Sequence, residues 1–177
     1  MKRSLLIGVF GVFGLIAPGQ WTSVGGGFIG PGRGMLWLPD SNCLVVTGAM
    51  SYAQLDSVPV RGVSYWKDDR WHAMAGGLRS QNNGPIEPGF DWVIYQQEVY
   101  VVGPFFQVDS VPETQKIARW ANGAWESAGL DSGSLINGGV AFASIVDDEL
   151  HLNGAFIAYL NGDSCSNWLI YDGTSWR

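Results

Sequence analysis

The stretch "FFQVDSVPETQKIARWANGAW", residues 105–125, decides the fold because it has a near copy upstream in "MSYAQLDSVPVRGVSYWKDDRW", residues 50–71. Both copies contain Asp-Ser-Val-Pro, and each ends with a tryptophan followed by a second tryptophan five positions later. The second tryptophan recurs at intervals of 50, 54 and 51 residues, at Trp21, Trp71, Trp125 and Trp176. A period of this length predicts a tandem-repeat architecture.

Two further sets of residues keep the same register. An aromatic residue precedes each of the last three of these tryptophans by five positions, at Trp66, Trp120 and Tyr171. A glycine closes an apolar run in each copy ("CLVVTG", "EVYVVG" and "ELHLNG"), at Gly48, Gly103 and Gly154. We expect all of these positions to be structural residues of the repeat.

Each period holds four short apolar or alternating runs separated by Gly, Pro, Asn and Asp, which is typical of β-strands joined by turns. In the first full copy the runs lie near residues 34–38, 43–48, 61–66 and 70–75. Asn122-Gly123 and Asp172-Gly173 suit tight hairpins with positive φ. The predicted fold class is all-β: a partial β-propeller of about three four-stranded antiparallel blades with repeats of about 50 residues. A β-sandwich is the alternative.

The chain resembles kelch-like and galactose-oxidase-type β-propeller repeats, and still more the divergent tandem propeller repeats of large secreted bacterial proteins. The pattern GGxF…IARWxGxxWxxLG recurs in the latter, and its match here is "GPFFQVDSVPETQKIARWANGAWESAG", residues 103–129. The likeness covers roughly residues 21–177. It departs from kelch repeats where Ala or Pro follows Gly48, Gly103 and Gly154 in place of a second glycine.

The N-terminus has the pattern of a signal peptide. Lys2 and Arg3 precede an apolar run, and Ala17-Pro18-Gly19 resembles a cleavage site. The run of 13 residues is shorter than the roughly 20 that a transmembrane helix needs. We therefore expect residues 1–19 to be a signal peptide, with an apolar first strand as the alternative, and the protein to be secreted, extracellular or at the cell surface.

Residues 20–177 are expected to form one propeller segment whose repeats end near Trp71, Trp125 and Trp176. The segment is expected to be incomplete at its C-terminus, because Arg177 comes just as the last strand begins. About three blades are fewer than the four to eight of typical propellers. Closure would therefore need further blades of the same chain or self-association.

The net charge and the distribution of basic residues limit the classes of partner that we expect. The formal net charge is −6, and it becomes −8 once Lys2 and Arg3 are removed. The remaining basic residues are scattered, whereas nucleic acids require clustered Lys and Arg. We expect no nucleic-acid partner and no membrane insertion after signal cleavage. A protein or a glycan is the expected kind of ligand.

The binding surface is predicted from loop length. In a meander the connections from the second to the third strand and from the fourth strand to the next copy emerge on one face, and here they are the long ones. In the third copy the predicted loop is "AYLNGDSCSN", residues 158–167. Binding usually resides on long loops held by a rigid scaffold. The candidate binding residues on this face are Asp56, Ser57, Arg79, Asn82, Asp109, Ser110 and Asp163.

Asp56 and Asp109 share one position in the repeat, and they are interpreted first as caps of backbone amides. The alternative is a set of carboxylates that binds cations or sugar hydroxyls. The repeat tryptophans are interpreted as core residues rather than as sugar-stacking surfaces. Trp37 and Trp92, which lie in the first run of their copies, are also predicted to be core residues.

We find no catalytic or metal-binding signature and expect no cofactor. His72 and His151 lack spaced partners, so both are interpreted as structural. Cys43 and Cys165 fall in different copies, and we expect no disulfide between them. The leading hypothesis is a secreted, non-enzymatic binding module. The alternatives are a fragment of a secreted carbohydrate-active or oxidising enzyme whose catalytic residues lie outside this chain, or a purely architectural repeat.

Overall fold

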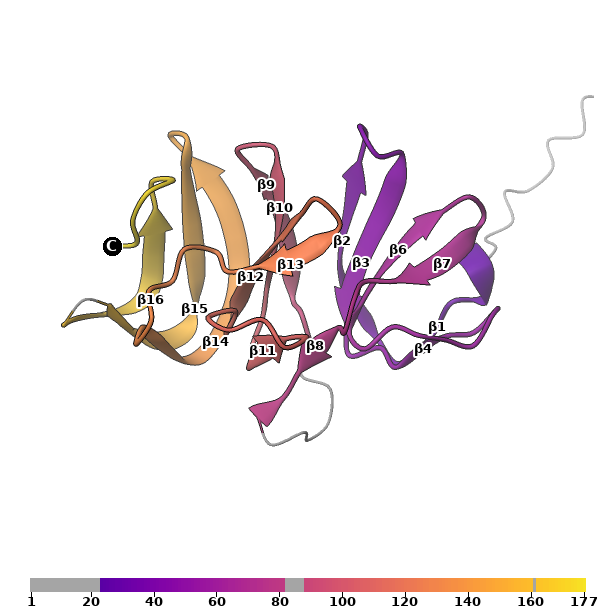
Figure 1. Ribbon diagram of the computed structural model, residues 1–177, viewed down its shortest axis with the longest axis horizontal. Coiled ribbons are helices and arrows are strands. Elements are labelled where there is room, and N and C mark those ends of the chain that lie inside the picture. Colours follow the sequence, from indigo (N-terminus) through magenta and orange to yellow (C-terminus); the bar gives the residue numbers. More distant parts are fainter. Residues whose placement is uncertain (1–22, 82–87, 161) are drawn as a thin grey trace, which may run out of the picture.

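The computed structural model describes residues 23–81, 88–160 and 162–177, and within them the protein is all-β. Antiparallel pairing joins the strands into three larger sheets that stand side by side, and two small sheets lie below them (Figure 1). A 3-10 turn, η1 (Val24–Gly26), precedes the strands. No helix in the described ranges is long and apolar enough to cross a membrane. The predicted signal peptide, Trp21 and Asn82 lie outside the described residues.

The first and second sheets are four-stranded meanders, as predicted for each copy. The first sheet contains β2 (Gly32–Leu38), β3 (Cys43–Gly48), β6 (Val63–Lys67) and β7 (Arg70–Ala73). The second sheet contains β9 (Asp91–Tyr95), β10 (Glu98–Val102), β12 (Ile117–Ala121) and β13 (Ala124–Glu126). The four runs read from the sequence of the first copy therefore match its strands to within a few residues.

The third sheet has longer strands: β14 (Leu135–Val146), β15 (Glu149–Leu160) and β16 (Asp163–Tyr171). A bridge from Tyr171 to Trp176 adds the start of a fourth strand. The prediction of a long loop at residues 158–167 is wrong, because β15 and β16 extend through it and pair Ala158 with Cys165. The pairing buries Ala158 and Leu160 against the second sheet, which favours strand over loop.

The two small sheets lie at the end of the molecule opposite the β2–β3, β9–β10 and β14–β15 hairpins (Figure 1). One contains β1 (Phe28–Ile29), β4 (Tyr52–Ala53) and β5 (Val58–Pro59), and the other contains β8 (Leu78–Arg79) and β11 (Gln107–Val108). In both, a strand that precedes one of the larger sheets pairs with the loop after that sheet's second strand: Phe28 with Ala53, and Leu78 with Val108.

The five-residue spacing of the aromatics is explained by cross-strand pairing. Each pair lies directly opposite across a hairpin, and its rings are 4.7–5.1 Å apart: Trp66 with Trp71, Trp120 with Trp125, and Tyr171 with Trp176. The hairpin predicted at Asn122-Gly123 is confirmed, with φ of 52° and 80°. At Asp172-Gly173 the glycine alone has positive φ, 95°.

The repeat tryptophans are core residues, as predicted, and two of them also join consecutive copies. Trp71, Trp125 and Trp176 are 5–8% exposed. The indole Nε1 of Trp71 donates to the carbonyl of Val24 (3.1 Å), and that of Trp176 donates to Ala128 (2.9 Å). Each acceptor stands three residues after the repeat tryptophan of the preceding copy. The indole nitrogen of Trp125 has no hydrogen-bond partner in the described part of the chain.

The repeated glycines are explained by a close backbone approach. A Cβ at Gly48, Gly103 or Gly154 would collide with the backbone that enters the first strand of its own sheet, namely at the carbonyl oxygens of Pro31, Pro88 and Gly139. A side chain at this position would push the first two strands of the sheet apart. Each apolar run therefore ends in glycine for a steric reason.

The core lies between the sheets. The first and second sheets pack through residues such as Val45, Val63 and Val101, and the second and third through residues such as Ile117 and Leu152. The first strands of the sheets, β2, β9 and β14, are neighbours in this order. Cys43 is buried, Cys165 is half-buried, and both are free cysteines.

Trp92 is buried, as predicted, but the prediction that Trp37 is a core residue is wrong. Trp92 packs between the first and second sheets and is 5% exposed. Trp37 is 51% exposed, because it lies on the face of β2 that is turned away from the second sheet. The two tryptophans differ because no described sheet covers that face of β2.

Candidate functional site

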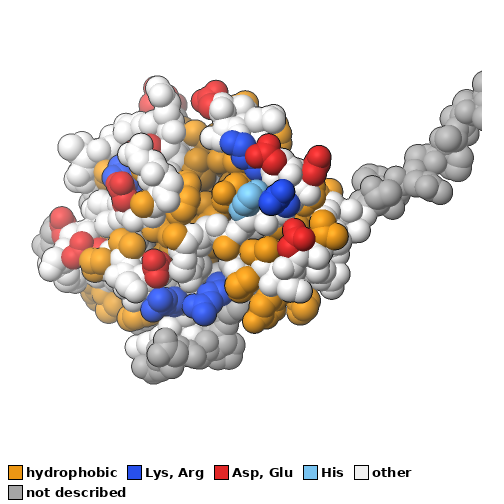
Figure 2. Space-filling view, turned by 45° about the vertical axis from the view of Figure 1, so that its right-hand side comes forward, with side chains coloured by type: hydrophobic (Ala, Val, Ile, Leu, Met, Phe, Trp, Pro, Cys, Tyr) orange, Lys and Arg blue, Asp and Glu red, His pale blue; other side chains and the backbone are white. Residues whose placement is uncertain are grey.

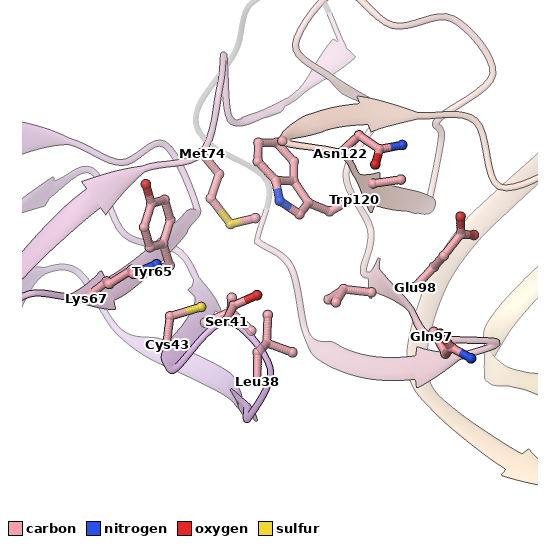
Figure 3. A pocket seen from close by; sticks show the side chains of 14 residues that line it. Leu38, Ser41, Cys43, Tyr65, Lys67, Met74, Gln97, Glu98, Trp120 and Asn122 are labelled. Atoms are coloured by element: carbon pink, nitrogen blue, oxygen red, sulfur yellow. The ribbon is translucent and has the colours of Figure 1, made fainter.

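A cleft of about 500 Å³ lies between the first and second sheets. It is at the end of the sheets where the β2–β3, β9–β10 and β12–β13 hairpins turn. Hydrophobic side chains are gathered in a hollow of the surface, with charged side chains of both signs around it (Figure 2). The walls come from both sheets (Figure 3). The cleft is lined by Leu38, Ser41, Cys43, Val45, Tyr65, Lys67, Met74, Gln97, Glu98, Val99, Trp120, Ala121, Asn122 and Gly123.

The first sheet supplies an apolar floor and an aromatic wall. Leu38 and Cys43 are buried at the start of the cleft, and burial raises the pKa of the Cys43 thiol. The ring of Tyr65 stacks on His72 at 4.7 Å with an interplanar angle of 9°. The Nε2 atom of His72 lies 3.2 Å from the carbonyl oxygen of Lys67. This stack holds Tyr65 in place and leaves Lys67 beside it at the end of β6.

The second sheet supplies the opposite wall. Trp120 is half-buried and rests edge-on against Trp125, with ring centroids 4.8 Å apart. In Figure 3 the Trp120 ring lies across the cleft from Tyr65, and Asn122 stands beside it. Asn122 has positive φ in the turn that follows β12, so the hairpin places this residue at the rim.

Glu98 adds a carboxylate to the rim, and its neighbours hold it in place. One of its oxygens accepts a hydrogen bond from Arg119 at 2.7 Å, and Arg119 also pairs with Glu126. Burial and the nearby Glu98 raise the pKa of Tyr100 to about 12. Glu98 therefore belongs to an ion-pair network with Arg119 and Glu126.

The cleft combines two aromatic side chains, an ammonium, a carboxylate and side-chain amides over an apolar floor. His72 is turned to a backbone carbonyl, so it is not arranged as a base for the Cys43 thiol. Among the residues that the structure describes, no three His, Cys, Asp or Glu side chains are grouped so that they could hold a metal ion.

Of the candidate residues predicted from loop length, Asn82 lies outside the described residues, and none of the others lines the cleft. The structure brings Arg79 and Asp109 together, with a guanidinium nitrogen 3.3 Å from a carboxylate oxygen. Asp56, Ser57 and Ser110 are exposed in turns. Asp163 is exposed at the start of β16, within the hairpin that replaces the expected loop.

The two Asp-Ser-Val-Pro motifs adopt different turns. In the second copy Val108 pairs with Val111, so that Asp109 and Ser110 alone form the turn. In the first copy Ala53 pairs with Val58 across four residues. The carboxylate of Asp109 pairs with Arg79, whereas it was predicted to cap backbone amides. The turn of the first copy is thus two residues longer than that of the second, so the two identical tetrapeptides lie in different environments.

Sequence reasoning missed the cleft because its walls come from different copies. From the sequence, Trp120 was identified only as a structural residue of the repeat. Tyr65 and Lys67 were not identified as site residues. The one available signal was the Asn122-Gly123 turn directly after Trp120, which places an amide beside an aromatic ring.

Neither a protein-family model nor a curated protein sequence matches this chain. The geometry of the cleft therefore carries the functional proposal.

Proposed function

We propose that this protein is a β-propeller-type binding module that takes an oligosaccharide into the cleft between its first two sheets. The proposal includes a partial propeller of three four-stranded blades. Three features support this architecture: the adjacency of β2, β9 and β14, the meander order of the first two sheets, and the indole hydrogen bonds that link consecutive copies.

The observation that carries the oligosaccharide proposal is the half-buried Trp120 ring, which faces Tyr65 across the cleft. Aromatic rings offer a large, rigid apolar surface, which suits the C–H face of a sugar. Polar groups at a rim fix orientation through hydrogen bonds, and Lys67, Gln97 and Asn122 provide such groups for sugar hydroxyls. The aromatic rings thus suit the apolar C–H face of a sugar, and the polar side chains suit its hydroxyl groups.

The size of the cleft favours a small ligand over a protein surface. Small-molecule sites usually measure about 300–1,000 Å³, and a stable protein interface buries roughly 800 Å² on each partner. A volume of about 500 Å³ falls in the first range. We therefore place the glycan, rather than the protein ligand, in this cleft.

The remaining parts of the proposal follow from the sequence. The protein is proposed to be secreted and non-enzymatic, with the long-loop face as a second surface that could take a protein partner. The ion pair of Arg79 with Asp109 gives that surface one ordered polar feature.

Titration of the protein with a panel of neutral, acidic and amino oligosaccharides, followed by calorimetry and tryptophan fluorescence, tests the proposal. We expect at least one class to bind with a change in indole fluorescence. Trp120→Ala and Lys67→Met should weaken that binding about fivefold or more, since each removes a contact worth about 1 kcal/mol or more.

Because Trp120 also packs on Trp125, Asn122→Asp serves as a variant that keeps the turn and changes only the rim. Tyr52→Ala is the matched control, because Tyr52 is an exposed aromatic residue on β4, outside the cleft. Binding that is lost in Tyr52→Ala but kept in Trp120→Ala and Asn122→Asp would contradict the proposed site.

A further inference from the structure

The same repeat position is buried in two sheets and exposed in the third. Val63, Ile117 and Trp168 each pair with the residue before the repeat glycine of their sheet. Val63 and Ile117 are fully buried because the following sheet covers them, whereas Trp168 is 55% exposed. Among the residues that the structure describes, nothing therefore covers the third sheet at the position that the next sheet covers elsewhere.

In the first sheet the exposed face is the other one, which in the second sheet packs against the preceding sheet. Met35 and Trp92 are equivalent, because each pairs with the strand residue two positions before the repeat glycine. Trp92 is buried against the preceding sheet, but Met35 is 73% exposed. The segment that contains Phe28 covers the outer strands of this face through Trp71 (4.3 Å), and no described element covers β2 on this face.

We call these surfaces the trailing face of the third sheet, with Phe142, Ile157, Tyr159 and Trp168, and the leading face of the first sheet, with Met35 and Trp37. All six side chains are more than 40% exposed. The two faces lie at opposite ends of the row of sheets (Figure 1). Contiguous exposed apolar patches of this kind mark interaction sites.

The internal interfaces indicate which surfaces fit together. In both of them the trailing face of one sheet packs on the leading face of the next: Val63 lies in one cluster with Trp92, and Ile117 lies in one cluster with Leu152 and Leu169. The uncovered trailing face is thus the counterpart of the uncovered leading face. One copy cannot join them, because they stand at its two ends.

We infer that two copies of this chain associate head to tail, with the trailing face of each third sheet packed on the leading face of the other copy's first sheet. The inference rests on the propeller architecture proposed above. Propellers typically have four to eight blades, and six is the one multiple of three in that range. Two copies of three sheets form a closed ring with two equivalent contacts, and no edge face stays exposed.

Light scattering and sedimentation velocity on the full chain over a wide concentration range test the inference. We expect twice the mass of one chain at high concentration. Met35→Glu on the leading face and Phe142→Glu on the trailing face should each weaken dimerisation by at least ~100-fold, because each buries an unpaired carboxylate. Both side chains are exposed in one copy, so the variants should fold; circular dichroism checks this, and Trp37→Glu is the second leading-face variant.

A mixture of the two variants discriminates the geometry. Met35→Glu keeps a sound trailing face and Phe142→Glu keeps a sound leading face, so the mixture should form a heterodimer through one sound contact. Phe106→Glu, at an exposed apolar residue outside both end sheets, is the control and should not change the mass.

A monomer at every concentration would overturn the inference, and so would a Met35→Glu variant that still dimerises with itself. An equal effect of Phe106→Glu would overturn it as well, because association would then not depend on the end faces. These outcomes do not bear on the cleft, since oligosaccharide titration of the monomeric Met35→Glu variant tests that site separately.

Discussion

The second and third sheets follow the same repeat, yet one is enclosed on both faces and the other on one. Ile117 of the second sheet is fully buried, whereas its counterpart Trp168 is 55% exposed and donates its indole hydrogen to His151. Strand length differs too, from five residues in β10 to 12 in β15. A repeat position thus sets the direction of a side chain, and the neighbouring sheet sets how deeply it is buried.

The largest expected difference is between Ile117→Ala and Trp168→Ala, both made in the monomeric Met35→Glu background. Ile117→Ala removes a fully packed side chain and should lower the free energy of unfolding by about 2–5 kcal/mol. Trp168→Ala should lower it by about 1 kcal/mol or less, because half of the ring already contacts water. Denaturant unfolding measures both.

Equal losses for the two variants would contradict the comparison. A large loss at Trp168 would mean that its contact with His151 stabilises the sheet more than its exposure indicates. His151→Gln separates the cases, since it removes the imidazole partner and leaves the Trp168 ring.

The next comparison concerns the repeat tryptophans. Trp176→Phe breaks the buried hydrogen bond to the carbonyl of Ala128, whereas Trp125→Phe removes an indole nitrogen without a partner in the described residues. Both variants lose similar ring area. We expect Trp176→Phe to cost about 1 kcal/mol more, the net value of one hydrogen bond. Thermal unfolding of the two variants tests this, and equal costs would refute it.

A smaller difference is expected between the two Asp-Ser-Val-Pro motifs. Asp109→Asn removes the ion pair with Arg79 and keeps a residue that tolerates the positive φ of 49°. We expect a loss of about 0.2–1 kcal/mol, because both side chains are more than a third exposed. Asp56→Asn should change stability by less than that. The difference should shrink in high salt, and persistence in high salt would contradict an ionic origin.

The smallest effect concerns pH at the last hairpin. Backbone hydrogen bonds from Ser175 and Thr174 lower the pKa of Asp172 to about 2. Because the folded pKa lies below the unfolded value of about 3.9, the stabilisation is present above pH ~3.9 and is lost as pH falls through about 2. Asp172→Asn should therefore melt lower than the unsubstituted chain at neutral pH and equally near pH 2. A carboxyl titration by NMR with a midpoint near 4 would refute this.

Much of the fold follows from local sequence. The run "CLVVTG" predicts a strand at residues 43–48, and β3 occupies the same residues. The spacing of Trp66 and Trp71 reflects a hairpin whose two central residues, Asp68 and Asp69, both have positive φ. Local signals suffice here because hairpin register depends on a few neighbouring residues.

What could not be predicted depends on neighbours that are distant in the chain. Trp37 and Trp92 have the same residue type in the first strand of their sheets, but only Trp92 has a sheet against it. The cleft is a further case, because Tyr65 and Trp120 face each other only after two sheets have packed. Loop length directed the prediction to the opposite end of the molecule, and that surface stays a prediction.

The direction of the indole hydrogen bonds has a consequence for synthesis. The acceptors of Trp71 and Trp176 lie 47 and 48 residues upstream of their donors. When each tryptophan emerges from the ribosome, its acceptor has already emerged. Each of these tryptophans can therefore bond to the segment before it as soon as it is synthesised. Folding can proceed in the order of translation without waiting for the C-terminus.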